Sequence, residues 1–94
     1  MAQVVAKEAN SITGSASVKG SAGSVLALTL AAGSDAATAI VYDNTAAAGE
    51  VEWELAAAAN TSESISFGLH PLKCNTGIYV ALTGTSHRLS IQYE

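Results

Sequence analysis

The sequence predicts an all-β protein: an antiparallel β-sandwich or jelly-roll-like barrel of about six to eight strands, with an extended N-terminal arm. Apolar and polar residues alternate with a period of two in several short segments, as they do in half-buried strands. Turn residues, mainly Gly, Asn, Asp and Ser, separate these segments. The length of 94 residues suits one domain.

Residues 1–24 are predicted to form the arm, and residues 25–94 the sandwich. The arm is rich in Ser, Gly and Ala, with only short apolar pairs such as Val4 and Val5. It contains a predicted edge strand at residues 3–7 and a weaker one at residues 15–19. Two interpretations stay open: an extended arm that becomes ordered against a neighbouring subunit, or a plain N-terminal hairpin of the same domain.

The first strand of the sandwich is predicted at residues 25–30, where Leu26, Leu28 and Leu30 alternate with smaller residues. A second strand is predicted at residues 38–43, which are rich in β-branched side chains. An Ala-rich loop closed by Gly49 follows it, at residues 44–49.

Residues 50–55 fit either a strand or a helix. Ala, Glu and Leu favour a helix on propensity alone, and Val51 and Leu55 have helical spacing. A helix would, however, place Trp53 on the opposite side, among the glutamates. A period of two explains all three large residues, so a strand is predicted. Its inward residues are Val51, Trp53 and Leu55, and its outward residues are Glu50, Glu52 and Glu54.

The next strand is predicted at residues 63–69, with Ile65, Phe67 and Leu69 in phase. Residues 71–74 are predicted as a short edge segment, because Pro71 cannot donate a hydrogen bond to a central ladder.

The last 18 residues show the clearest alternation, in two strands joined by a short Gly/Ser/Thr loop that we expect to close a hairpin. Residues 78–83 and 88–93 are the two strands. The inward residues are Ile78, Val80 and Leu82 in the first strand, and Leu89, Ile91 and Tyr93 in the second.

Composition limits both the core and the partners. Nineteen residues are Ala, whereas Leu, Ile, Val and Phe together number 21, so we expect a thin core that oligomerisation would help. The net charge is −4 and the four basic residues are scattered, so no nucleic-acid partner is expected. The longest uncharged stretch, residues 20–34, is too short to span a membrane.

The sequence predicts no catalytic, cofactor-binding or metal-binding residue, and hence no enzyme. His70 and Cys74 lie four residues apart but lack further ligands for a metal. Nothing marks Cys74 as a nucleophile, and His87 is expected in a loop. The glutamates of residues 50–54 are expected to form a solvated face, or else to meet basic residues of a partner. The start lacks a secretory signal, and a single cysteine fits synthesis in a reducing cytoplasm.

Candidate contact residues come from the faces that the alternation leaves outside. Tyr79 points away from the face of Ile78 and Val80, together with Thr83, and tyrosine is favoured at protein interfaces. The candidate contacts with other subunits or with a partner protein are Tyr79 and Thr83, together with Val4 and Val5 of the arm.

Four motifs follow one another from residue 42 onward: a strand ending in Tyr42-Asp43, an Ala/Gly loop, a short strand centred on Ser66-Phe67, and the closing segment Asn75-Thr76-Gly77-Ile78-Tyr79-Val80 with Thr83-Gly84-Thr85 and a final aromatic. In this order the motifs resemble those of small β-sandwich virion proteins of tailed bacteriophages. The resemblance covers roughly residues 25–94, and the arm shows no such likeness.

The resemblance implies a structural protein made in the host bacterial cytoplasm and located in the virion. Its leading role is capsid decoration: a homotrimer without cofactors that binds the major capsid protein and stabilises the shell. The alternative is a tail- or fibre-associated module that binds a host glycan or receptor, which would need an exposed aromatic platform such as Tyr79 with Tyr42 or Trp53.

Overall fold

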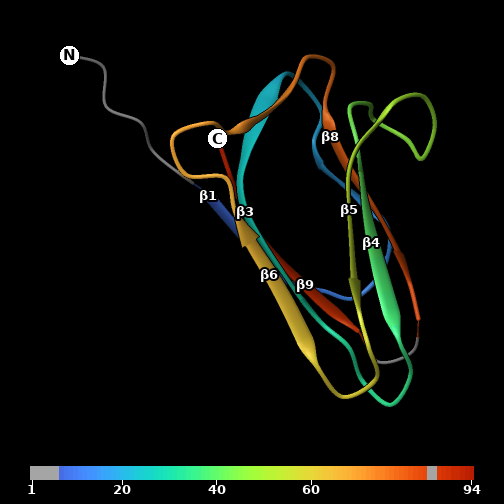
Figure 1. Ribbon diagram of the computed structural model, residues 1–94. Helices are drawn as coiled ribbons and strands as arrows, with labels where there is room; N and C mark the ends of the chain where they lie inside the picture. The colour runs from blue at the N-terminus through green and yellow to red at the C-terminus, as the bar shows by residue number, and fades with distance from the viewer. Residues whose placement is uncertain (1–6, 85–86) are drawn as a thin grey trace.

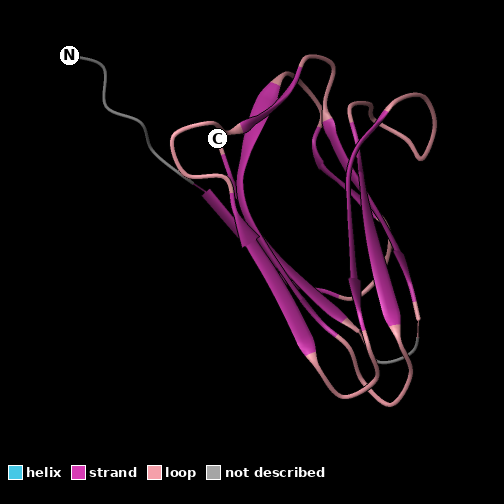
Figure 2. Cartoon of the chain, in the orientation of Figure 1, coloured by secondary structure: helices cyan, strands magenta, loops and turns pink. Residues whose placement is uncertain are grey.

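The computed structural model describes residues 7–84 and 87–94, and this part of the chain is built from two antiparallel sheets with no helix (Figures 1 and 2). An all-β sandwich is therefore confirmed. Nine strands lie in the described ranges: β1 (Lys7–Ile12), β2 (Ala16–Lys19), β3 (Gly23–Ala31), β4 (Ala37–Tyr42), β5 (Val51–Ala57), β6 (Ser62–Ser66), β7 (Leu72–Cys74), β8 (Ile78–Thr83) and β9 (Arg88–Tyr93).

The strand order is that of a double-sheet jelly roll. The first sheet runs β1-β9-β3-β6, and the short β7 also pairs with β3. The second sheet runs β2-β8-β4-β5. Among consecutive strands, only β4 with β5 and β6 with β7 stay in one sheet, and the other connections cross between the sheets. This alternation wraps the chain around a single core, as in other jelly rolls.

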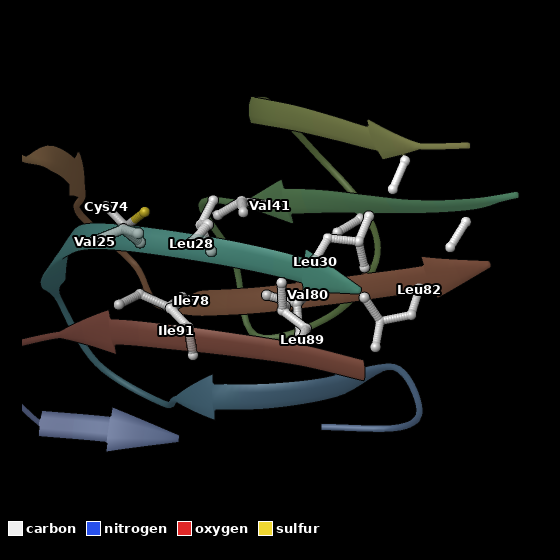
Figure 3. Close-up of a cluster of buried hydrophobic side chains, with 13 residues drawn as sticks. Val25, Leu28, Leu30, Val41, Cys74, Ile78, Val80, Leu82, Leu89 and Ile91 are labelled. Atoms are coloured by element: carbon white, nitrogen blue, oxygen red, sulfur yellow. The ribbon is translucent and has the colours of Figure 1, made fainter. Parts of the chain in front are cut away.

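The core lies between the two sheets, where their inward residues meet (Figure 3). Leu28 and Leu30 of β3 and Leu89 of β9 come from the first sheet and are 0–1% exposed. Val41 of β4 and Val80 of β8 come from the second sheet and are fully buried. Three buried alanines, at positions 37, 39 and 57, complete the second sheet's side, so this half of the core is thin.

A β-bulge in β3 corrects the predicted alternation of residues 25–30. The register with β9 shifts between Val25 and Ala27, so Leu26 is the extra residue. Val25 and Leu28 are buried, whereas Leu26 is only partly buried. A bulge inserts one residue and resets which side chains face inward, an effect that local alternation does not reveal.

A second bulge moves Val51 to the outside, against the prediction that it faces inward. In β5, Trp53 lies opposite Val41, but Val51 lies opposite Tyr42, so the register shifts at Glu52. Cross-strand partners share a face of the sheet. Val51 is accordingly on the outer face with Tyr42 and is 50% exposed. Trp53 and Leu55 pack against the core as predicted, and the strand interpretation of this segment is confirmed.

The strand predicted at residues 63–69 ends earlier than expected, and Leu69 is not part of its inward face. β6 ends at Ser66, and Gly68 adopts a left-handed φ of 60° that turns the chain. Leu69 is consequently 94% exposed, whereas Ile65 and Phe67 pack against the core.

The two closing strands do not form the predicted hairpin. β8 pairs with β2 and β4 in the second sheet, whereas β9 pairs with β1 and β3 in the first. Their alternation is correct, since Ile78, Val80, Leu89 and Ile91 are buried. Alternation specifies the face of a strand but not its neighbour, because any strand of suitable register can provide the pairing.

The described part of residues 1–24 supplies one outer strand to each sheet. β1 pairs with β9, and β2 pairs with β8. These two strands therefore do not pair with one another as a hairpin, and residues 7–19 supply strands to the sandwich itself instead of extending away from it. The strand predicted at residues 15–19 corresponds to β2. Of the strand predicted at residues 3–7, only Lys7 is described, at the start of β1, and Val4 and Val5 lie outside the described residues.

Candidate contact face of the second sheet

The outer face of the second sheet carries a row of side chains across all four strands. Tyr79 of β8 lies directly opposite Tyr42 of β4 on one side and Ser17 of β2 on the other. Tyr42 in turn lies opposite Val51 of β5. Side chains opposed in this way lie about 5 Å apart at their Cβ atoms, so the two tyrosines are direct neighbours.

Two further rows continue the same face toward the other end of the sheet. Ile40 lies between Ala81 and Glu54, and Thr38 lies between Thr83 and Ala56. The Thr38 and Thr83 hydroxyls are hydrogen-bonded to each other. We call these ten residues the contact face: Ser17, Thr38, Ile40, Tyr42, Val51, Glu54, Ala56, Tyr79, Ala81 and Thr83.

The contact face is poor in charge. Glu54 is its one ionisable carboxylate, and aromatic or aliphatic side chains occupy its centre. The outer face of the first sheet differs, because Thr29 there lies between Ser64 and Ser90, and Ala31 lies between Ser62 and Arg88. On the strands themselves, outward aromatic and aliphatic side chains are thus more numerous on the second sheet, where Val51 is exposed and Ile40, Tyr42 and Tyr79 are partly buried.

The structure brings together two of the four predicted contact residues. Tyr79 is partly buried and Thr83 is exposed on the same face of β8. Val4 and Val5 are outside the described residues. Sequence reasoning missed Ile40, and it named Tyr42 only as a partner of Tyr79 in a possible aromatic platform. β-Branched residues occupy both faces of residues 38–43, so either face could have been inward. Sequence reasoning also missed Val51, whose placement depends on the bulge.

One end of this sheet is held by the side chain of Asp43, which follows β4. Its Oδ1 accepts hydrogen bonds from the backbone N–H groups of Thr76 (2.7 Å) and Gly77 (3.5 Å). The amides of Thr76 and Asn75 lower the pKa of Asp43, and that of Gly77 adds to this effect. These contacts join the loop after β4 to the loop before β8.

Asn44 organises the neighbouring loop, residues 44–49. Its Nδ2 donates to the carbonyl of Ala48 at 2.9 Å, and Gly49 adopts the left-handed φ of 85° that brings the chain back to β5. The two segments most central to the virion-protein resemblance, Tyr42-Asp43 and the Asn75-x-Gly77 turn, are thus in direct contact through hydrogen bonds. These motifs therefore have a structural explanation.

Glu52 lies close to other acids at the same end of the sheet. Partial burial raises the pKa of Glu52, and the negative charges of Glu50 and Asp43 raise it further. The predicted outward row of three glutamates is therefore not regular. The bulge at Glu52 separates its two neighbours, and only Glu54 belongs to the contact face.

Cys74 and the two histidines occupy separate environments. Cys74 is 2% exposed, and burial together with the charges of Asp43 and Glu52 raises the pKa of its thiol to about 11. Such a thiol is protonated near neutral pH and is a poor nucleophile. His70, by contrast, is exposed on the turn between β6 and β7.

His87 is not the ordinary loop residue that the sequence predicts. It is 9% exposed, and neither ring nitrogen has a hydrogen-bond partner among the described residues. It immediately precedes β9, where the chain crosses from the second sheet to the first.

Within residues 7–84 and 87–94, no group of three or more His, Cys, Asp or Glu side chains is arranged to hold a metal ion. The same ranges contain no helix long and apolar enough to cross a membrane. Comparisons of the chain with protein-family models, with curated proteins and with solved structures gave no significant match.

Proposed function

We propose that this chain is a structural virion protein of a tailed bacteriophage, a capsid decoration protein that binds the outer shell and stabilises it. The observation that carries the proposal is the contact face, an apolar and charge-poor surface on the outside of a small sandwich. Such a surface favours association with protein. The phage assignment is supported by the resemblance over residues 25–94. The jelly-roll order agrees with it at the level of fold alone, since jelly rolls recur in viral capsids but also in lectins and cupins.

We further propose that the contact face joins copies of this chain into a homotrimer. Ile40 lies in its middle row and Tyr79 in the next row, and pairing these side chains with another copy would remove apolar surface from water. Because alanines line the second sheet's side of the core, each copy has little stability of its own. Burial of surface between copies therefore adds to the stability of the assembly.

Light scattering coupled to size-exclusion chromatography tests the trimer. We expect a particle of three times the 9.4 kDa chain mass. Ile40→Lys places a charge in the contact face and should give folded monomers. Thr29→Lys places the same charge on the outer face of β3 in the first sheet and should leave the trimer intact. Wild-type monomers at all concentrations, or equal behaviour of the two variants, would count against the trimer through this face.

The virion role is tested by sedimenting the purified chain with empty shells of the phage whose genome encodes it. Saturable co-sedimentation at a fixed ratio to the capsid subunits is the expected result. A chain that stays in the supernatant at micromolar concentration, and that is missing from purified virions by mass spectrometry, would overturn the proposal.

A second candidate function, binding of a host glycan, is favoured by one observation. Tyr42 and Tyr79 are direct cross-strand neighbours on an outer face, and aromatic rings in such a position can stack on sugar rings. Trp53 takes no part, because it packs against the core. A glycan array would show binding that Tyr42→Ala abolishes; an array without signal would remove this candidate.

A further inference from the structure

The chain between β6 and β7 presents an isolated apolar side chain on a well-anchored turn. Leu69 is 94% exposed, the highest exposure among the large apolar residues described. The turn protrudes from the first sheet, away from β4 and β5 (Figure 1). It is therefore separate from the contact face, which belongs to the second sheet.

Both sides of this turn are fixed to the body of the protein. On the incoming side, the Phe67 N–H donates to the Leu26 carbonyl at 3.0 Å, and the Phe67 ring meets the Trp53 ring edge-to-face with centroids 5.0 Å apart. Within the turn, the His70 N–H donates to the Phe67 carbonyl at 3.1 Å, and Gly68 supplies the left-handed φ. On the outgoing side, Leu72 of β7 pairs with Val25 of β3.

An exposed leucine held in this way loses little conformational freedom when it binds. A pre-organised turn reduces the entropic cost of association, and the leucine side chain gains from leaving water. Pro71 strengthens the effect, because a proline restricts the backbone of the residue before it, here His70. The turn therefore has the properties of an anchor that inserts into a pocket on a partner.

The charges around the turn indicate what kind of pocket fits it. Residues 67–73 contain no acid, and Lys73 of β7 is exposed, whereas the chain as a whole has a net charge of −4. Glu94 lies one strand beyond Lys73, because both residues pair with Ser24 of β3, and it is separated from Lys73 by that strand. An apolar pocket with carboxylates on its rim would complement both Leu69 and Lys73. A second copy is a poor receptor, because the described part of this chain has no pocket that could take a leucine side chain.

We propose that Leu69 is the anchor by which this protein binds a different protein, inserting into an apolar pocket with an acidic rim. This inference rests on the proposed function, under which the partner is the shell protein. The contact face then holds the copies together, and the three Leu69 turns of a trimer bind the shell. Three weak anchors acting together give tight binding through avidity.

The experiment measures binding of the full chain to empty shells for the wild type, Leu69→Ala, Leu69→Met and Lys73→Glu. Leu69→Ala should weaken binding at least tenfold, Leu69→Met should retain it, and Lys73→Glu should weaken it more at low salt than at high salt. Thr29→Ala, also exposed on the first sheet, is the matched control. Because Leu69 is almost fully exposed, its variants should keep the wild-type Tm and solution mass.

Each outcome has one meaning. If the wild type binds shells and Leu69→Ala binds them equally well, the anchor role of Leu69 is overturned but the decoration role is not. No binding by the wild type overturns the decoration role and the partner assigned here. A third outcome is that the chain binds vesicles of phosphatidylglycerol through Leu69 while its binding to shells does not depend on Leu69. That result would show that the turn binds a membrane, and it would overturn the proposal that Leu69 binds a protein.

Discussion

The Asp43 carboxylate accepts a hydrogen bond from the Thr76 amide at 2.7 Å, across 33 residues of sequence. This contact joins the end of β4 to the start of β8, the two central strands of the second sheet. It also brings together two of the motifs on which the resemblance to virion proteins rests, Tyr42-Asp43 and Asn75-Thr76-Gly77. The stability of this end of the sandwich should depend on it.

Asp43→Ala should lower Tm by a few degrees, because two backbone amides lose their acceptor. The folded-state pKa of Asp43 lies below its ordinary value of 3.8. Its contribution is therefore fully present above that value and is lost as the pH falls through the folded-state pKa. The Tm difference between wild type and variant should shrink in acid, as thermal scans by circular dichroism can show. Asp35→Ala, at an exposed position, is the control, and a difference that persists unchanged at pH 2 would contradict the assignment.

Gly77→Ala should destabilise the fold by about 1–3 kcal/mol, the usual cost of an overpacked site. An added Cβ would lie 2.9 Å from the carbonyl oxygens of both Lys19 and Asn44, and these backbone atoms cannot easily move. Gly14→Ala is the matched control, since nothing lies within 4 Å of its added Cβ. Chemical denaturation gives both free energies. Equal values for the two variants would show that the loop relaxes around the new methyl group.

Glu52→Gln should stabilise the protein at neutral pH. Burial and the neighbouring acids Glu50 and Asp43 raise the folded-state pKa of Glu52, so the folded state favours its protonated form. The ionised side chain therefore destabilises the folded state. This destabilisation is absent below pH 4.5 and develops as the pH rises through the folded-state pKa. Solvent screening keeps the gain below about 0.5 kcal/mol.

A pair of Tm measurements checks this prediction. The increase in Tm for Glu52→Gln should be present at pH 7 and absent at pH 3, where both side chains are neutral. Glu63→Gln removes the same charge from an exposed position on β6 in the other sheet. If Glu63→Gln stabilised the protein equally, net charge rather than the local cluster would be the cause.

Cys74 should react with an aromatic disulfide reagent only after unfolding. Its thiol is 2% exposed and has a pKa of about 11, so very little thiolate exists at pH 8 and the reagent cannot reach it. Labelling in guanidinium chloride provides the fully reactive reference. Cys74→Ala should also be less destabilising than Cys74→Ser, because serine would bury a hydroxyl group. Fast labelling of the folded protein would contradict this burial.

The period-two patterns of the chain are sufficient to predict the all-β class and most of the inward faces. In β8 and β9 every residue predicted to be inward is buried or packs against the core. Alternation is a local property of the extended chain, so a strand with one apolar face can be recognised from its own residues. The choice of strand over helix for residues 50–55 followed from the same rule, against the propensity of Ala and Glu.

Tertiary structure alone decided the bulges, the partners of the strands and the contact face. The extra residues at Leu26 and Glu52 are defined by the neighbouring strand, so neither is visible in its own segment. The separation of β8 from β9 into different sheets depends on pairing between residues far apart in the chain. The sequence by itself therefore determined which residues form extended strands with one apolar and one polar face. Long-range backbone pairing decided which strands are neighbours and, through one bulge, placed Val51 beside Tyr42 on the outside.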